Sequence, residues 1–176
     1  MHILVALQVQ LNYQLFFITF HGRTGLNLLP STCQKLCKIS NIVAIKEASG
    51  DLSQIAKIAS FCKDELYIYS GNDDQILPVL SLGGIGAISV LSNILPLDTH
   101  KMIYSFLDGD FETAKKIQIN TLPITNALFS EVNPIGIKSA LNFMGYQVGI
   151  PRLPLVEMSA EGKKQLKSAM EIYGLL

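Results

Sequence analysis

The fold is decided by the stretch Asn-Ile-Val-Ala-Ile-Lys-Glu-Ala-Ser-Gly-Asp, which occupies residues 41–51. Within it, an uninterrupted apolar run from Ile42 to Ile45 leads directly into Lys46. A short run rich in β-branched residues and closed by Ser-Gly is typical of a strand that is buried on both faces, as in a parallel sheet. The stretch therefore predicts a buried parallel strand with Lys46 at its end.

Lys46 has two interpretations at that position. Burial disfavours the charged form of a lysine and lowers its pKa. A neutral amine on a rigid strand is what Schiff-base chemistry with a carbonyl substrate requires. In the alternative, the ammonium group reaches solvent or pairs with Glu47 and has no chemical task. The stretch alone leaves both interpretations open.

Strands alternate with helices along the first part of the chain. Besides 41–46, strands are predicted over 15–20, 66–69 and 86–90. Helices are predicted between them, one beginning at Pro30, one capped by Asp51 and one capped by Asp73 or Asp74. The second of these helices has a predicted buried stripe that consists of Leu52, Ile55, Ile58 and Ala59. Strands joined by helices across short Gly-bearing turns indicate an α/β fold with a parallel sheet.

The strand pattern stops near residue 96. Helices are predicted over 98–107, 111–129, 135–144 and 159–172, and we expect this helical region to pack on the part that precedes it. The sequence therefore divides into an atypical segment 1–21, a region of alternating strands and helices 22–95, and a helical region 96–176.

Composition limits the possible functions. The chain has 176 residues, of which 49% are hydrophobic and 16% charged, with a formal net charge of +0, so it is long enough for a real core. No basic run is present, which argues against nucleic acid or a membrane as partner. Cys33, Cys37 and Cys62 have no metal-binding spacing and are expected to be reduced thiols in a cytoplasmic protein, with Cys33 and Cys37 as packing residues on one helix face.

Several motifs occur together in this chain. Besides residues 45–51, they are Gly-Arg-Thr-Gly at 22–25, Ser-Gly-Asn-Asp at 70–73, Gly-Gly-Ile-Gly-Ala-Ile-Ser-Val at 83–90 and Glu-Val-Asn-Pro at 131–134. In this order they resemble the dihydrodipicolinate synthase family, pyruvate-dependent class I aldolases built on a TIM barrel. The resemblance runs from about Gly22 to Leu155. It implies the second, C-terminal half of a TIM (β/α)8 barrel, followed by a helical C-terminal extension.

The resemblance implies a Schiff-base mechanism. Lys46 would attack the ketone of pyruvate and form an imine with loss of water. Loss of a methyl proton would then give an enamine that attacks the aldehyde of aspartate semialdehyde. The product would cyclise to 4-hydroxy-tetrahydrodipicolinate, an intermediate of lysine and diaminopimelate biosynthesis. Because the lysine itself is the electron sink, no cofactor and no metal are implied.

Three further residues match family positions. Arg23 would hold the carboxylate of the semialdehyde through two parallel hydrogen bonds, although it could also be a surface arginine in a turn. Gly71 and Ile88 would contact pyruvate mainly through their backbones, and plain packing is the alternative for both. The family's proton-relay tyrosine would fall at Ile18, which cannot transfer a proton.

The chain is short for a TIM barrel, which typically has about 250 residues. The motifs belong to the second half, so we expect a truncated chain that lacks the family's pyruvate-binding threonines. If Leu15 uses a TTA codon, a two-base frame shift over residues 14–21 permits Pro-Ile-Ile-Leu-Tyr-Asn-Val-Pro, the family's own strand. Residues before about Gly22 could thus be translated out of frame, with ordinary divergence as the alternative.

Two functions follow from these observations. One is a lyase subunit of the dihydrodipicolinate synthase type, a homo-oligomer that is a tetramer in the family when intact. Gly-Arg-Thr-Gly favours it over sister aldolases that act on sialic acid or sugar acids. The other is a non-catalytic truncated remnant.

Overall fold

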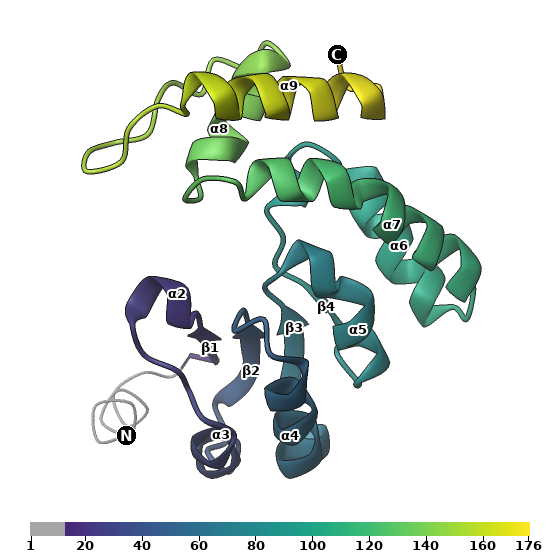
Figure 1. Ribbon diagram of the computed structural model, residues 1–176. Coiled ribbons are helices and arrows are strands. Elements are labelled where there is room, and N and C mark those ends of the chain that lie inside the picture. Colours follow the sequence, from purple (N-terminus) through teal and green to yellow (C-terminus); the bar gives the residue numbers. More distant parts are fainter. Residues whose placement is uncertain (1–12) are drawn as a thin grey trace. The chain divides into compact units, whose positions relative to one another are not determined.

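The computed structural model describes residues 13–176 and divides the chain into two compact units (Figure 1). One unit ends at Ile88 and the other runs from Ser89 to Leu176. The division thus falls a little before residue 96, where the sequence indicated the start of the helical region. Most of the segment 1–21 that the sequence set apart lies outside the described residues.

The first unit contains a parallel sheet with the strand order β1-β2-β3-β4. Its strands are β1 (Leu15–Thr19), β2 (Ile42–Glu47), β3 (Tyr67–Ser70) and β4 (Gly86–Ala87). The helical segments between them are α2 (His21–Thr24), α3 (Pro30–Leu36), α4 (Leu52–Cys62), η1 (Lys63–Glu65), η2 (Asp73–Gln75) and α5 (Ile76–Ser81). The predicted α/β fold with a parallel sheet is therefore confirmed.

Local sequence explains where these helices begin. Pro30 occupies the first turn of α3, where its fixed φ angle suits a helix and its missing N–H costs nothing. Asp51 caps α4, because its Oδ1 accepts hydrogen bonds from the backbone N–H groups of Ser53 at 2.8 Å and Gln54 at 3.1 Å. Both starts agree with the sequence-based prediction.

One face of the sheet packs against α3, α4 and α5. The buried core on this side consists of Cys33, Leu36, Cys37, Ile42, Ile45, Ile55, Ile58, Cys62, Leu66, Ile68 and Val79. Successive side chains of a strand point to opposite faces, so the alternate residues of β1 and β3 lie on the other face. There Phe16, Ile18 and Tyr67 are 50%, 61% and 55% exposed.

The second unit consists of helices. They are η3 (Leu91–Asn93), α6 (Pro96–Leu107), α7 (Phe111–Leu128), α8 (Ile135–Phe143) and α9 (Ala160–Tyr173). Two of them have side-chain caps, since Asp110 accepts from the N–H of Thr113 and Ser159 accepts from the N–H of Gly162. Their core consists of Leu91, Ile94, Leu95, Ile124, Leu128, Ile135, Ile137, Ala140, Met158, Leu166 and Met170. The four long helices match those predicted from the sequence to within a few residues.

Two features of the sheet region differ from the prediction. The predicted strand over 86–90 is only Gly86–Ala87, because the chain turns at Ser89, whose Oγ accepts from the N–H of Ser92 at 2.9 Å. The one-turn helix α2 was not predicted, since four residues are too few to show a helical period.

Two side chains also lie elsewhere than predicted. Neither Asp73 nor Asp74 caps α5, because the 3-10 turn η2 precedes this helix and neither element has a side-chain cap bond. Leu52 is 38% exposed, although the predicted stripe of α4 included it. Gln54 is buried instead, because a polar network described below receives its side chain.

Candidate active site

The four residues singled out by the sequence lie at or just after the carboxyl ends of four neighbouring strands. Arg23 lies just after β1, Lys46 near the end of β2, Gly71 just after β3 and Ile88 just after β4. In a parallel sheet these ends lie on the same edge, where α/β folds place their binding sites. The order of the four residues in space therefore follows their order in the sequence.

Lys46 is half-buried in the sheet. Burial lowers the pKa of its ammonium group, and the negative charge of Asp73 opposes this effect only in part. Asp73 itself is 1% exposed, so its carboxylate lies inside the protein and not at the helix start that the sequence suggested. A lowered pKa increases the fraction of neutral amine, which is the form that attacks a carbonyl carbon.

Gly71 packs directly against Lys46. A Cβ atom at position 71 would lie 2.9 Å from Cε of Lys46 and equally close to the carbonyl oxygen of Glu47, so no larger residue fits without displacement. The N–H of Gly71 donates to that same carbonyl at 2.7 Å. The structure thus brings Lys46 and Gly71 together, and glycine is needed here for close approach.

Ile88 continues the sheet beside β3. Its N–H donates to the carbonyl of Ser70 at 2.8 Å, and its side chain is 40% exposed. Because the N–H groups of Gly71 and Ile88 both bond within the protein, a backbone contact with a substrate would have to use a carbonyl oxygen. Of the backbone contacts with pyruvate that the resemblance implied for Gly71 and Ile88, those through the N–H groups are therefore disfavoured and those through the carbonyl oxygens remain.

Arg23 lies on the exposed helix α2. Its guanidinium carbon lies 5.6 Å from the centre of the Phe20 ring, within the range of a cation–π interaction. Thr24 steadies the same turn, because its Oγ donates to the carbonyl of Phe20 at 3.2 Å. Arg23 thus lies in a short helix that follows β1, the strand paired with the strand of Lys46. Its described contact is with Phe20, whereas Lys46 and Gly71 contact each other.

The residues on either side of Lys46 share its face of the sheet. Ile18 on β1 and Tyr69 on β3 are its register partners in the two neighbouring strands. Whatever side chain stands at position 18 therefore lies beside the lysine, and here it is an isoleucine without a titratable group. The sequence analysis did not single out Tyr69, although its alternation with Tyr67 around the buried Ile68 was a visible signal.

The described part of the chain has no arrangement suited to a metal ion. Among residues 13–176, no group of three or more His, Cys, Asp or Glu side chains could hold one. The predicted packing role of Cys33 and Cys37 is confirmed, since both are buried in the core with Cys62. Burial raises the pKa of Cys33 and Cys62 to about 12, so both remain thiols at neutral pH. No helix within residues 13–176 is long and apolar enough to span a membrane.

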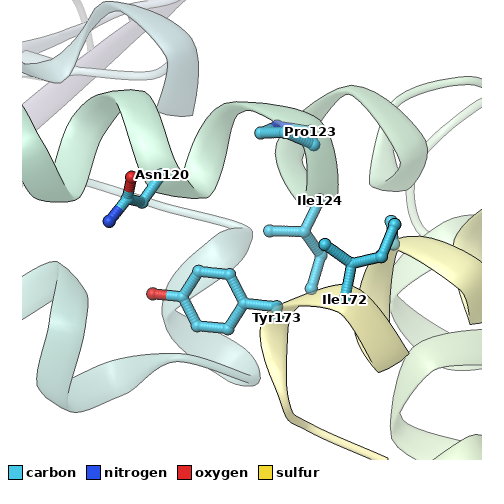
Figure 2. A pocket seen from close by; sticks show the side chains of 6 residues that line it. Asn120, Pro123, Ile124, Ile172 and Tyr173 are labelled. Carbon is cyan, nitrogen blue, oxygen red and sulfur yellow. The ribbon is translucent and has the colours of Figure 1, made fainter.

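A cavity of about 460 Å³ lies in the helical unit, between residues of α7 and α9 (Figure 2). It is lined by Asn120, Pro123, Ile124, Ala169, Ile172 and Tyr173. The Tyr173 hydroxyl donates to Oδ2 of Asp98 at 2.9 Å, and burial together with this bond raises the pKa of Tyr173 to about 12. Tyr173 is therefore neutral near pH 7, and none of the four candidate residues lines this cavity.

Comparison with known proteins identifies relatives of this chain. A 4-hydroxy-tetrahydrodipicolinate synthase from Caldicellulosiruptor saccharolyticus is 58% identical over 154 residues, which are 88% of this chain and 52% of that protein. One from Clostridium acetobutylicum, 4-hydroxy-tetrahydrodipicolinate synthase 1, is 49% identical over 166 residues, 94% of this chain and 57% of that protein. The chain thus spans about half the length of these curated relatives.

A solved structure shows the same likeness in three dimensions. The dihydrodipicolinate synthase from Thermotoga maritima superimposes with a TM-score of 0.94 at 34% identity, covering 97% of this chain and 59% of that one. The family model of the dihydrodipicolinate synthetase family matches residues 6–173. The chain therefore belongs to the dihydrodipicolinate synthetase family.

Proposed function

We propose that this chain is the C-terminal half-barrel and helical extension of a lyase that condenses pyruvate with aspartate semialdehyde to 4-hydroxy-tetrahydrodipicolinate. The observation that carries the proposal is the position of Lys46. It is half-buried, its pKa is lowered by burial, and it lies at the carboxyl edge of a parallel sheet in a family of synthases. The half-barrel assignment is supported by the four parallel strands among residues 13–176, because a TIM barrel has eight.

Each candidate residue has a task in this reaction. The neutral amine of Lys46 attacks the ketone carbon of pyruvate, and loss of water gives the imine. Gly71 keeps space beside the lysine Cε, so the amine can swing toward the substrate. Arg23 presents a guanidinium that binds the carboxylate of the second substrate through two parallel hydrogen bonds. Ile88 borders the site next to β3. The intact protein is a homo-oligomer in this proposal.

A second candidate function is a non-catalytic remnant. Ile18 favours it, because this isoleucine is the register partner of Lys46 where the family has its relay tyrosine. General acid–base groups usually contribute about two to four orders of magnitude in rate. Without an acid–base group at position 18, Lys46 would still be present as the nucleophile, but turnover would be slower.

The two substrates can be separated by one substitution. We define the restored protein as residues 22–176 joined to the first half-barrel and fifth strand of a relative. In it, Arg23→Ala should reduce kcat/KM for aspartate semialdehyde by about tenfold to a hundredfold, the worth of one charge-assisted hydrogen bond. Imine formation with pyruvate should be nearly unchanged, because Arg23 is assigned to the second substrate alone.

Parallel assays test the reaction itself. The restored protein should consume aspartate semialdehyde in the presence of pyruvate and should leave sialic acid uncleaved. Cleavage of sialic acid without use of the semialdehyde would show a sister aldolase. An equal loss of pyruvate trapping in Arg23→Ala would show that Arg23 supports the whole pocket and not the second substrate.

A further inference from the structure

Glu47 follows Lys46 and points to the opposite face of the sheet, where it is 1% exposed. Its carboxylate accepts three hydrogen bonds. Oε2 accepts from the N–H and the hydroxyl of Ser49, both at 2.8 Å, and Oε1 accepts from Nε2 of Gln54 at 2.6 Å. A buried carboxylate is costly unless such donors surround it, so this arrangement calls for a reason.

The bonds continue from Gln54 to the segment that follows Arg23. The side-chain amides of Gln54 and Asn27 bond to each other twice, with Asn27 Nδ2 donating at 2.7 Å and Gln54 Nε2 donating at 3.1 Å. Thr19 Oγ then donates to Asn27 Oδ1 at 3.1 Å and accepts from the N–H of Leu28 at 3.1 Å. A continuous path of hydrogen bonds therefore runs from Glu47 to Leu28.

The path requires two hydrogen-bond acceptors at the tip of the side chain at position 47, one for each oxygen of the present carboxylate. Ser49 presents two donors on one side and Gln54 presents an N–H on the other. A glutamine at position 47 has one acceptor oxygen and one donor NH2 group. If its oxygen accepts from Ser49, its NH2 group faces the N–H of Gln54, and two donors meet without an acceptor between them. Only a carboxylate satisfies both directions at once.

We propose that Glu47 is a positioning residue, whose buried carboxylate couples the loop that follows Lys46 to the segment that follows Arg23. The turn after β2 and the turn after α2 come from distant parts of the sequence, and this side-chain path ties them to the same edge of the sheet. The backbone carbonyl of Glu47 also accepts the N–H of Gly71 at 2.7 Å, so the same residue holds a third part of the site. The inference rests on the proposed function in so far as it concerns the reaction.

The coupling is measured by amide hydrogen exchange in the 176-residue chain, with all variants compared in the same state of association. In Glu47→Gln, exchange at the Leu28 N–H should become about tenfold to a hundredfold faster, because the bonds that fix Thr19 and Asn27 are weakened. Exchange at the Ser49 N–H should change less, since the amide oxygen of a glutamine at position 47 can still accept from Ser49. Glu65→Gln is the matched control, because Glu65 is exposed and bonds to Lys38, and it should leave both amides unchanged.

A reversed pair provides the rescue. In the double variant Glu47→Gln with Gln54→Glu, residue 47 keeps an acceptor for Ser49 and its NH2 group donates to the carboxylate at position 54, which still accepts from Asn27. Leu28 exchange should return to within about threefold of the parent chain, since one bond to Asn27 Oδ1 remains lost. A role limited to the local turn would not predict this rescue at Leu28.

Pyruvate trapping with borohydride connects the path to the chemistry. In the restored protein, adduct formation at Lys46 should be about tenfold slower in Glu47→Gln and should recover in the reversed pair. If the restored protein without this substitution forms no adduct, the proposed function fails, and Leu28 exchange in the 176-residue chain alone decides the coupling. If Glu47→Gln does not fold, Asn27→Ala replaces it, because the same path of hydrogen bonds passes through Asn27 and its interruption there should also slow adduct formation.

Unchanged Leu28 exchange in Glu47→Gln would overturn the proposal. Faster Leu28 exchange with an unchanged rate of adduct formation would also overturn it, because Glu47 would then be structural only.

Discussion

At the scale of single residues, Lys46 is subject to two opposing influences. Burial lowers its pKa, and the buried carboxylate of Asp73 raises it by a smaller amount. The sequence indicated the first influence, because an apolar run into a lysine predicts burial. It did not indicate the second, because Asp73 comes from a different strand end and looked like a helix cap.

Asp73→Asn in the restored protein should therefore lower the pKa of Lys46 further. The neutral side chain keeps the burial and removes the favourable charge, so the deprotonated amine persists to lower pH. The rate of pyruvate adduct formation against pH should rise through a midpoint below the ordinary lysine value of 10.5, and this midpoint should shift down in the variant. A midpoint that moves upward would show that Asp73 does not act through its charge.

The same depressed pKa has a consequence for stability. The unfolded chain binds the lysine proton more tightly than the folded chain does, so this group disfavours folding below the folded-state pKa. The penalty is relieved as pH rises through the folded pKa toward 10.5. Lys46 thus contributes to stability with the opposite sign to a lysine that gains a salt bridge.

The Glu47 path shows what a single sequence cannot reveal about a site. Glu47 stands next to the predicted nucleophile, but the sequence indicated no chemical role for it. Its side chain bonds to Ser49 and Gln54, and the path continues from there to Asn27 and Thr19. Such a set becomes visible only when the chain folds, because no periodicity or spacing relates its members. In contrast, Gly71 was found from its motif, and the structure supplies the physical reason in its closeness to Lys46.

At the scale of elements, the strong periodic segments were predictable and the short ones were not. The helices α6, α7, α8 and α9 each run for several turns with buried residues at helical spacing, and their bounds agree with the prediction to within a few residues. β4 has two residues and α2 has four, so hydrogen bonds of single side chains, those of Ser89 and Thr24, determine where these elements end. Leu52 was predicted to be buried and is partly exposed, because Gln54 takes the buried position, where its side chain bonds to Glu47.

The cap of α4 is an element whose worth can be measured. Asp51 bonds to two backbone N–H groups that have no other partner within the helix, and it also holds the end of the loop after Lys46. Asp51→Ala in the restored protein should lower the free energy of unfolding by about 0.5–2 kcal/mol in a urea titration. Asp64→Ala is the control, since Asp64 is exposed in η1. An equal loss in both variants would show a general charge effect and not a cap.

At the scale of the whole molecule, the decisive quantity is how much of a barrel is present. The chain spans about half the length of its curated relatives, and the sheet within residues 13–176 has four strands. The sequence predicted from its motif order that the chain spans only part of the family's length, and the half-barrel assignment stays a prediction. It could not predict which side chains would lie on the open face, where the structure places Phe16, Ile18 and Tyr67.

The 176-residue chain expressed by itself should therefore have no measurable synthase activity and should be poorly soluble or self-associated. Contiguous exposed apolar surface drives association, and Ile18 stands beside Lys46 without a group that can relay a proton. Light scattering after size exclusion and a coupled synthase assay measure the two properties. A soluble monomer with substantial turnover would contradict both the half-barrel assignment and the importance of position 18.

The most direct test of the account is the identity of the residue that binds pyruvate. The restored protein is incubated with pyruvate, reduced with borohydride and mapped by peptide mass. We predict one covalent adduct, located on Lys46 and absent in Lys46→Arg, because a guanidinium stays protonated and cannot attack a ketone. An adduct on any other lysine, or a folded restored protein that forms none, would contradict the account.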